Sequence, residues 1–240
     1  MAATDLTGPQ RHPAGVAAGV AAGALVAEDL ACRRGARLVF AGVSFVVPPG
    51  GALVVRGANG AGKSSLLRLV AGLVAPAAGR LVWGSQPLAA DPAGHRARLH
   101  YVGHQDAVKP GMTARDTLAF WAALRGHGRG ISLAIADALA SLALDPVADW
   151  PCRWLSAGQR RRLALARLLV APAELWLLDE PTTALDEDGR MRLETMIEAH
   201  RAGGGRVLLA THLPLALHGA ATLHLDRFAP LEDPAAETWT

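Results

Sequence analysis

The sequence is short of aromatic residues, cysteines and long apolar runs, and the last two shortages exclude whole classes of protein. Aromatic residues make up only 5% of the chain, so Ala, Leu and Val must form its core. The two cysteines, Cys32 and Cys152, belong to no CxxC or CxxCH pattern, which leaves a structural metal site or covalent haem attachment without support. No apolar run is long enough to span a bilayer. Residues 15–27 come closest, but their short Ala/Gly-rich stretch fits a flexible leader better than a signal peptide, with secretion as the alternative.

What the sequence has in quantity is apolar material for a folded core. Of its 240 residues, 51% are hydrophobic and 19% are charged, which excludes a disordered chain and fits one domain with a small inserted lobe. The formal net charge of +3 is too small to indicate a nucleic-acid partner, and we expect none. The one basic cluster, at 160–162, is interpreted as the solvated face of a helix.

Strand and helix patterns alternate along the chain, which predicts an α/β fold. Apolar runs without a helical period predict buried strands, whereas apolar residues three or four apart predict helices. The expected strands are 38–47, 52–56, 80–83, 175–178 and 207–210, with one more after Leu223. The expected helices are 63–71, 113–125, 131–144, a stretch from Ser156 and 191–201. We therefore expect a flexible leader at 1–23 and one domain at 24–240, with a mostly helical lobe inserted at about 91–155.

A glycine-rich loop follows the expected strand at 52–56 and precedes a helix. Its residues match the pattern G-x-x-x-x-G-K-[ST]: Gly57, Ala58, Asn59, Gly60, Ala61, Gly62, Lys63 and Ser64, followed by Ser65. Glycines let several backbone N–H groups point at one centre, and the following helix adds its positive N-terminal end. Lys63 would contact the β- and γ-phosphates of a nucleotide, and the hydroxyl of Ser64 would bind Mg²⁺ beside them.

Two acids and a histidine follow buried strands of the same expected sheet. Asp179 and Glu180 end the strand at 175–178, and His212 follows the strand at 207–210. Ligands of α/β proteins bind where such strands end. Asp179 would therefore hold Mg²⁺, Glu180 would act as general base toward water, and His212 would donate to a γ-phosphate oxygen. Gln105, after residues 102–104, is expected to contact Mg²⁺ or water.

A second anion site is predicted where the helix at Ser156 begins. The segment 155–159 reads Leu-Ser-Ala-Gly-Gln, in which Ser156 is a good N-cap and the small residues leave the helix end open. Ser156, Gly158 and Gln159 are its candidate contacts.

With these motifs together, residues 25–225 resemble the ATP-binding subunit of an ABC transporter. Residues 57–65 resemble its Walker A motif, 175–180 its Walker B motif, 155–159 its signature with Ala157 in place of a glycine, and 184–186 its D-loop. Gln105 and His212 resemble its Q-loop glutamine and switch histidine. The resemblance implies a RecA-like P-loop NTPase core with an antiparallel β subdomain, and ATP and Mg²⁺ as cofactors. It also implies a head-to-tail dimer on an integral membrane subunit, placed peripherally at the cytoplasmic face of the inner membrane.

One position departs from the family pattern. An aromatic ring usually stacks on adenine near the start of the domain, and here that place falls at Arg33 or Arg34. A guanidinium can stack on a base. Helix residues near Trp121 and Arg125 are expected to face the membrane subunit.

Several weaker stretches resemble one subfamily, the haem-exporter ATPase of cytochrome c maturation. They are residues 32–35, 101–105, 186–189 and 211–215. This resemblance implies a role in haem export and release of a haem-loaded chaperone, without haem binding by this chain. The alternatives are an ABC ATPase for another cargo, a soluble ABC ATPase of DNA repair or translation, and a small-molecule kinase.

Overall fold

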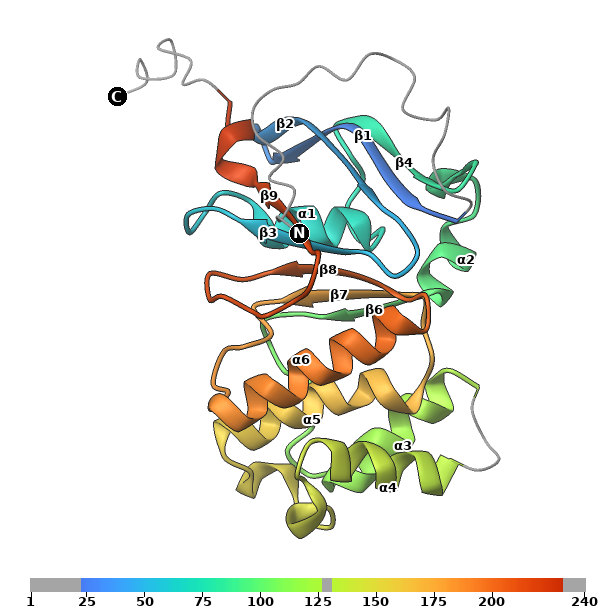
Figure 1. Cartoon of the computed structure of the whole chain (residues 1–240), viewed down its shortest axis with the longest axis vertical. Helices are drawn as coiled ribbons and strands as arrows, with labels where there is room; N and C mark the ends of the chain where they lie inside the picture. The colour runs from blue at the N-terminus through green and yellow to red at the C-terminus, as the bar shows by residue number, and fades with distance from the viewer. Residues whose placement is uncertain (1–22, 127–130, 231–240) are drawn as a thin grey trace.

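The computed structural model describes residues 23–126 and 131–230, which fold as two sheets with helices between and beneath them (Figure 1). The expected leader at 1–23 lies outside the described residues except for Gly23. Within the described ranges no helix is both long and apolar enough to cross a bilayer.

The first sheet is antiparallel and has the strand order β2-β1-β4-β5. Its strands are β1 (Leu25–Arg34), β2 (Arg37–Val47), β4 (Ala78–Trp83) and β5 (Gln86–Pro87). The β1–β2 hairpin brings Arg34 opposite Arg37. In β2 the buried residues Phe40, Val43, Phe45 and Val47 are separated by more exposed ones. This pattern fits a sheet with one covered face.

The second sheet is parallel and has the strand order β6-β7-β8-β3-β9. Its strands are β3 (Ala52–Arg56), β6 (Leu99–Val102), β7 (Leu175–Asp179), β8 (Arg206–Ala210) and β9 (Ala221–His224). Every residue of β7 and β8 is buried, as expected for strands covered on both faces. The α/β class and the separate antiparallel sheet are confirmed.

Six helices complete the described fold, in the order of the chain. They are α1 (Lys63–Val70), α2 (Pro92–Ala97), α3 (Ala114–Leu124), α4 (Ile131–Ser141), α5 (Ala157–Val170) and α6 (Glu187–Ala202). In Figure 1, α1 lies between the two sheets, while α3 to α6 lie on the opposite face of the parallel sheet. Short 3₁₀ turns occupy Leu88–Ala90, Asp145–Val147, Cys152–Trp154 and Leu225–Phe228.

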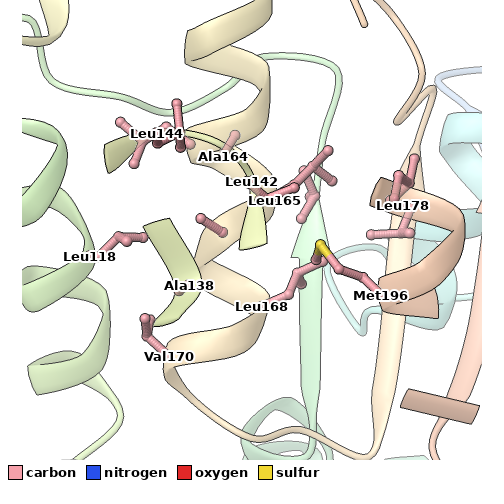
Figure 2. Close-up of a cluster of buried hydrophobic side chains, with 14 of the residues drawn as sticks. Leu118, Ala138, Leu142, Leu144, Ala164, Leu165, Leu168, Val170, Leu178 and Met196 are labelled. Atoms are coloured by element: carbon pink, nitrogen blue, oxygen red, sulfur yellow. The ribbon is translucent and has the colours of Figure 1, made fainter. Parts of the chain in front are cut away.

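Two apolar clusters fill the two faces of the parallel sheet. Successive residues of β7 alternate between them: Leu177 joins the cluster with α1 and the antiparallel sheet, and Leu178 joins the cluster with α3 to α6. Figure 2 shows Leu118, Leu165 and Leu178 in the second cluster. Each buried leucine stabilises the folded state by about 2 kcal/mol. The two clusters therefore hold the strands in position, together with the polar residues at the strand ends.

The structure differs from the sequence interpretation at several boundaries. The range 91–155 includes β6, which belongs to the parallel sheet, so the inserted helices begin only at Ala114. Helix α6 begins at Glu187 rather than at 191, because the Asp186 side chain accepts a hydrogen bond from the Gly189 N–H and caps it. Helix α4 ends at Ser141 rather than 144.

Candidate functional site

The parallel pairing of β3, β7 and β8 brings the predicted site residues to one edge of the sheet. Asp179 lies opposite Ala210, and Val55 lies opposite the same Ala210, so the chain leaves all three strands at one level. The glycine-rich loop follows β3, Glu180 follows β7 and His212 follows β8. Segments far apart in the sequence therefore meet as the strand pattern predicts.

The glycine-rich loop needs its glycines for conformation and for space. Gly57, Gly60 and Gly62 all have positive φ, at 146°, 86° and 99°. A Cβ on Gly62 would stand 2.5 Å from Cγ1 of Val39, so β2 lies directly against the loop. No acidic residue occupies the first turn of α1, which leaves its N-terminal N–H groups free to attract an anion.

Lys63 lies within this loop, and its side chain curls back over it. Its Nζ donates to the carbonyl oxygens of Gly57 and Ala58, at 2.8 and 3.1 Å. The residue is only 8% exposed. The loop thus holds an ammonium group next to the N-terminus of α1, where both attract phosphate.

Ser64 in the first turn of α1 meets Asp179 at the end of β7, and both are potential ligands of a cation. Ser64 Oγ donates to Asp179 Oδ1 at 3.0 Å, and the Tyr101 hydroxyl donates to Oδ2 at 3.5 Å. Asp179 is 1% exposed. A hydroxyl and a carboxylate at this separation fit Mg²⁺, which takes one or two protein oxygens and completes its shell with water and phosphate. Tyr101 was not predicted; burial raises its pKa, so it stays a neutral donor.

Glu180 lies beyond the end of β7 in a strained conformation, against His212. Its φ is 48°, the left-handed region that costs a residue with a side chain about 1 kcal/mol or more. Its Oε2 lies 2.9 Å from Nδ1 of His212, and its backbone N–H donates to Ala210 O at 2.8 Å. The Glu180 side chain is 16% exposed and that of His212 62%. The carboxylate is therefore shielded on one side and oriented by the ring.

Arg161 is a functional residue that the sequence interpretation missed. It was placed on a solvated helix face, but it is 2% exposed and donates to the carbonyl oxygens of Asp179 and Glu180 at 2.9 and 2.7 Å. It also donates to Asp106 Oδ1 at 3.1 Å, in the loop after β6. The guanidinium therefore ties the acidic strand end to that loop. Its fork geometry serves several carbonyls at once.

The loop after β6 turns Gln105 outward. Gln105 is exposed, and its neighbour His104 lines the pocket formed by the glycine-rich loop and Glu180. The structure therefore brings Lys63, Ser64, Asp179, Glu180 and His212 together, and leaves Gln105 outside this group.

The pocket has a volume of about 460 Å³ and extends from the loop to the β1–β2 hairpin. Lys63, Ser64, Ser65 and Glu180 line one part, together with Asn59, Gly60 and Gly62. Arg34, Arg37 and Val39 line the part at the hairpin. Arg33, the other candidate at this position, instead donates to Ala36 O at 2.9 Å within the turn.

The second predicted anion site forms a capped helix end on the surface. Ser156 Oγ accepts from the Gln159 N–H at 3.1 Å, and Gln159 Oε1 accepts from the Ser156 N–H at 2.8 Å. Ser156 is exposed, and the site does not line the pocket of Lys63. A Cβ on Gly158 would stand 2.9 Å from the Ala184 carbonyl oxygen, so this helix end is packed against the turn after β7.

Comparison with known proteins identifies close relatives. The ABC transporter family model matches residues 40–183. A protein of Rhodospirillum rubrum named cytochrome c biogenesis ATP-binding export protein CcmA is 57% identical over 208 residues, which cover 87% of either chain. A protein of the same name from Paramagnetospirillum magneticum is 52% identical over 86% of this chain and 96% of its own. An ABC transporter ATP-binding protein from Pyrococcus furiosus, 24% identical, aligns over 86% of this chain and 99% of its own with a TM-score of 0.76, which shows a shared fold.

Proposed function

Because this chain belongs to the ABC transporter family and is an ATP-hydrolysing subunit of it, we propose that it powers the export step of cytochrome c biogenesis. The relatives that share its sequence over most of its length carry the name of a cytochrome c biogenesis ATP-binding export protein. The main structural support for ATP hydrolysis is that Lys63, Ser64, Asp179 and Glu180 lie together at one edge of the parallel sheet.

The glycine-rich loop from Gly57 to Ser65 would bind the phosphates of ATP. Its N–H groups and the N-terminus of α1 attract the anion, and Lys63 Nζ exchanges its carbonyl partners for phosphate oxygens. Ser64 and Asp179 would hold Mg²⁺, with Gln105 able to join after a movement of its loop. When bound, Mg²⁺ neutralises charge on the phosphates.

Glu180 would act as the general base for the attacking water. Its carboxylate lies in the pocket of the phosphate loop, and Oε2 is oriented by His212. A protonated His212 ring can donate from Nδ1 to Glu180 and from Nε2 to a γ-phosphate oxygen at the same time. Arg161 supports both acids by holding the carbonyls of Asp179 and Glu180.

Ser156, Gly158 and Gln159 would complete the site of a second copy of this chain. They lie outside the pocket that contains Lys63, and Ser156, which caps their helix, is exposed. A head-to-tail dimer would bring each helix end to the partner's γ-phosphate. The dimer would sit on an integral membrane subunit at the cytoplasmic face of the inner membrane.

For the cargo, we propose haem, released to apocytochromes through a haem-loaded chaperone, without haem contact by this chain. The test is to delete the gene in its host and stain membranes for covalently bound haem. Wild type and Glu180→Gln are then restored separately. Loss of c-type cytochromes that only wild type rescues is the expected result. Normal c-type cytochromes in the deletion, with no second gene copy, would contradict the haem proposal.

A further inference from the structure

A groove follows helix α6 on the face of the parallel sheet that α3 to α6 cover (Figure 1). It consists of two adjoining pockets of about 630 and 800 Å³, whose walls share Pro172, Ala173, Ala199 and His200. We call these two pockets the α6 groove. Its second pocket borders Arg206, where β8 begins, whereas the nucleotide pocket lies where the parallel strands end. The α6 groove is therefore a separate site.

The first pocket of the α6 groove is mostly apolar and runs along the helix. Its walls include Leu168, Trp176, Met191 and Met196. From Met191 to His200 the helix advances about 14 Å, which is long enough for an extended alkyl chain. Methionine side chains adapt their shape to what they contact, and Met191 is 53% exposed. A pocket of this size and lining is typical of a small-molecule site.

The second pocket is positively charged, because two arginines share one carboxylate there. Oε2 of Glu174 lies 3.9 Å from Nη1 of Arg206, and Oε1 lies 3.9 Å from Nε of Arg98. Arg206 is only 5% exposed and also donates to the Gly23 carbonyl oxygen. Burial lowers the pKa of Arg206, and its Nε has no hydrogen-bond partner in the described part of the chain. A second anion at this place would be stabilised.

Two more buried nitrogen atoms beside the groove have no partner within residues 23–126 and 131–230. They are Nε1 of Trp176 and Nε2 of His200. The two rings stack flat on each other, with centroids 3.9 Å apart. An indole N–H is only a donor, and leaving it unpaired in the interior is costly. His200 is partly exposed and lines both pockets, so a turn of its ring would let an acceptor reach Trp176.

We propose that the α6 groove binds a long-chain carboxylate, with the carboxylate group between Arg98 and Arg206 and the alkyl chain along α6 toward Met191. The groove offers positive charge and N–H donors at one end and an apolar wall along the rest, which is the complement of an anionic amphiphile. The side chain of Glu174 is 52% exposed and can turn into water when the carboxylate of the ligand takes its place. The site goes beyond the ATPase function, because none of its residues lines the nucleotide pocket.

The test is a calorimetric titration of the purified full-length chain with decanoate in buffer without detergent. We expect saturable binding of one decanoate per chain. The uncharged alcohol 1-decanol has the same alkyl chain and should bind at least about tenfold more weakly, the scale of one charge-assisted hydrogen bond. Acetate, a carboxylate without the chain, should give no measurable binding at the same concentrations. Equal affinity for decanoate and 1-decanol would overturn the proposal, because the arginines would then take no part.

Two variants with matched controls locate the binding site. Arg206→Gln should weaken decanoate binding at least about tenfold, whereas Arg96→Gln, an exposed arginine of α2 outside the groove, should leave it unchanged. Because Arg206 is buried, thermal unfolding checks that this variant is folded. Ala199→Phe is independent of that residue and places a ring where the two pockets join, so it should also weaken binding. Ala202→Phe, at the exposed end of α6 and outside both pockets, is its control.

The indole N–H of Trp176 gives a local readout of the same site. Decanoate should shift its signal in a proton–nitrogen correlation spectrum, in which Trp176→Phe assigns the signal. The signal of Trp154, which is 62% exposed on the helical lobe, should stay in place. An unchanged Trp176 signal at saturating decanoate would overturn the proposal. So would the same decanoate affinity in wild type, Arg206→Gln and Ala199→Phe.

Discussion

Nδ1 of His212 lies 2.9 Å from Oε2 of Glu180, although the two residues are 32 positions apart. They follow adjacent parallel strands, β7 and β8, and this pairing alone brings them together. The contact keeps a carboxylate oriented at the edge of the nucleotide pocket. It also identifies the group whose loss should stop hydrolysis.

Glu180→Gln should abolish ATP hydrolysis while ATP binding is kept. The amide has the shape of the carboxylate and can still accept from His212, but it cannot take a proton from water. We expect turnover to fall by at least about a hundredfold, the scale of general base catalysis. Phosphate release and ATP affinity measured on the same membrane complex test this. Glu187→Gln, an exposed acid at the start of α6, is the control. Hydrolysis at the wild-type rate would show that Glu180 is not the base.

Lys63→Ala should weaken ATP binding. The change removes the buried ammonium that contacts Gly57 O and Ala58 O and that we assign to the phosphates. A charge-assisted contact of about 1.5–3 kcal/mol corresponds to a rise in the ATP Kd of roughly tenfold to a hundredfold. Equilibrium binding of a fluorescent ATP analogue measures it. Lys109→Ala removes an exposed lysine that lies over the Phe120 ring and should leave the Kd unchanged. An unaltered affinity in Lys63→Ala would refute the assignment.

Gly158→Ala should impair hydrolysis through a local steric clash. The added Cβ would stand 2.9 Å from the Ala184 carbonyl oxygen, so either α5 or the turn after β7 must shift. We expect a loss of about 1–3 kcal/mol in the free energy of unfolding and lower ATPase activity. Urea unfolding and phosphate release measure the two effects. Gly111→Ala is the matched control, because its Cβ would meet nothing within 4 Å. Equal behaviour of the two variants would contradict the packing argument.

Buried histidines should make the fold less stable in mild acid. Burial is the main cause that lowers the pKa of His100 to about 4 from 6.5, and burial also lowers the pKa values of His95 and His200. Between pH 4 and pH 6.5 the unfolded chain therefore binds more protons at His100 than the folded chain does. Stability from His100 is complete above pH 6.5 and is lost as the pH falls toward 4, by up to about 3 kcal/mol.

Urea unfolding at pH 7 and pH 5 measures this loss. His100→Gln retains an amide able to reach the Ala171 carbonyl oxygen, which His100 Nε2 contacts at 2.6 Å, and removes the titrating group. The variant should lose less free energy of unfolding between the two pH values than wild type does. An identical pH dependence would show that His100 does not contribute.

The sequence was sufficient for those parts of the site that depend on local pattern. The loop at 57–65 and the motif at 175–180 could be predicted from their residue types and spacing alone. The parallel sheet could be predicted because continuous apolar runs are typical of strands buried on both faces. The burial and contacts of Arg161 could not be predicted. The sequence pattern of an amphipathic helix does not show which of its polar residues will contact a carbonyl group at the end of a distant strand. Strand β6 was missed for a similar reason, because His100 interrupts its apolar run, and that side chain is buried only through its contact with the Ala171 carbonyl oxygen. Both features depend on contacts between residues that are far apart in the sequence.

The expected contact of helix residues near Trp121 and Arg125 with the membrane subunit stays a prediction, and the exposure of the side chains on α3 makes it more specific. Trp121 packs against the core beneath Arg167, and Arg125 donates to Ala97 O at 2.8 Å, so both face this chain. Phe120 and Leu124 instead are 44% and 63% exposed. They are the apolar side chains of α3 that a partner can cover.

Phe120→Ser combined with Leu124→Ser should therefore weaken attachment to the membrane subunit without loss of the fold. Two large apolar contacts at the centre of an interface are worth about 2–4 kcal/mol, or roughly thirtyfold and more in affinity. Co-purification of the membrane subunit with the tagged chain measures attachment, and thermal unfolding checks the fold. Leu133→Ser, on α4 and 70% exposed, is the matched control. If the double variant keeps the membrane subunit bound as wild type does, the interface lies on another face of the chain.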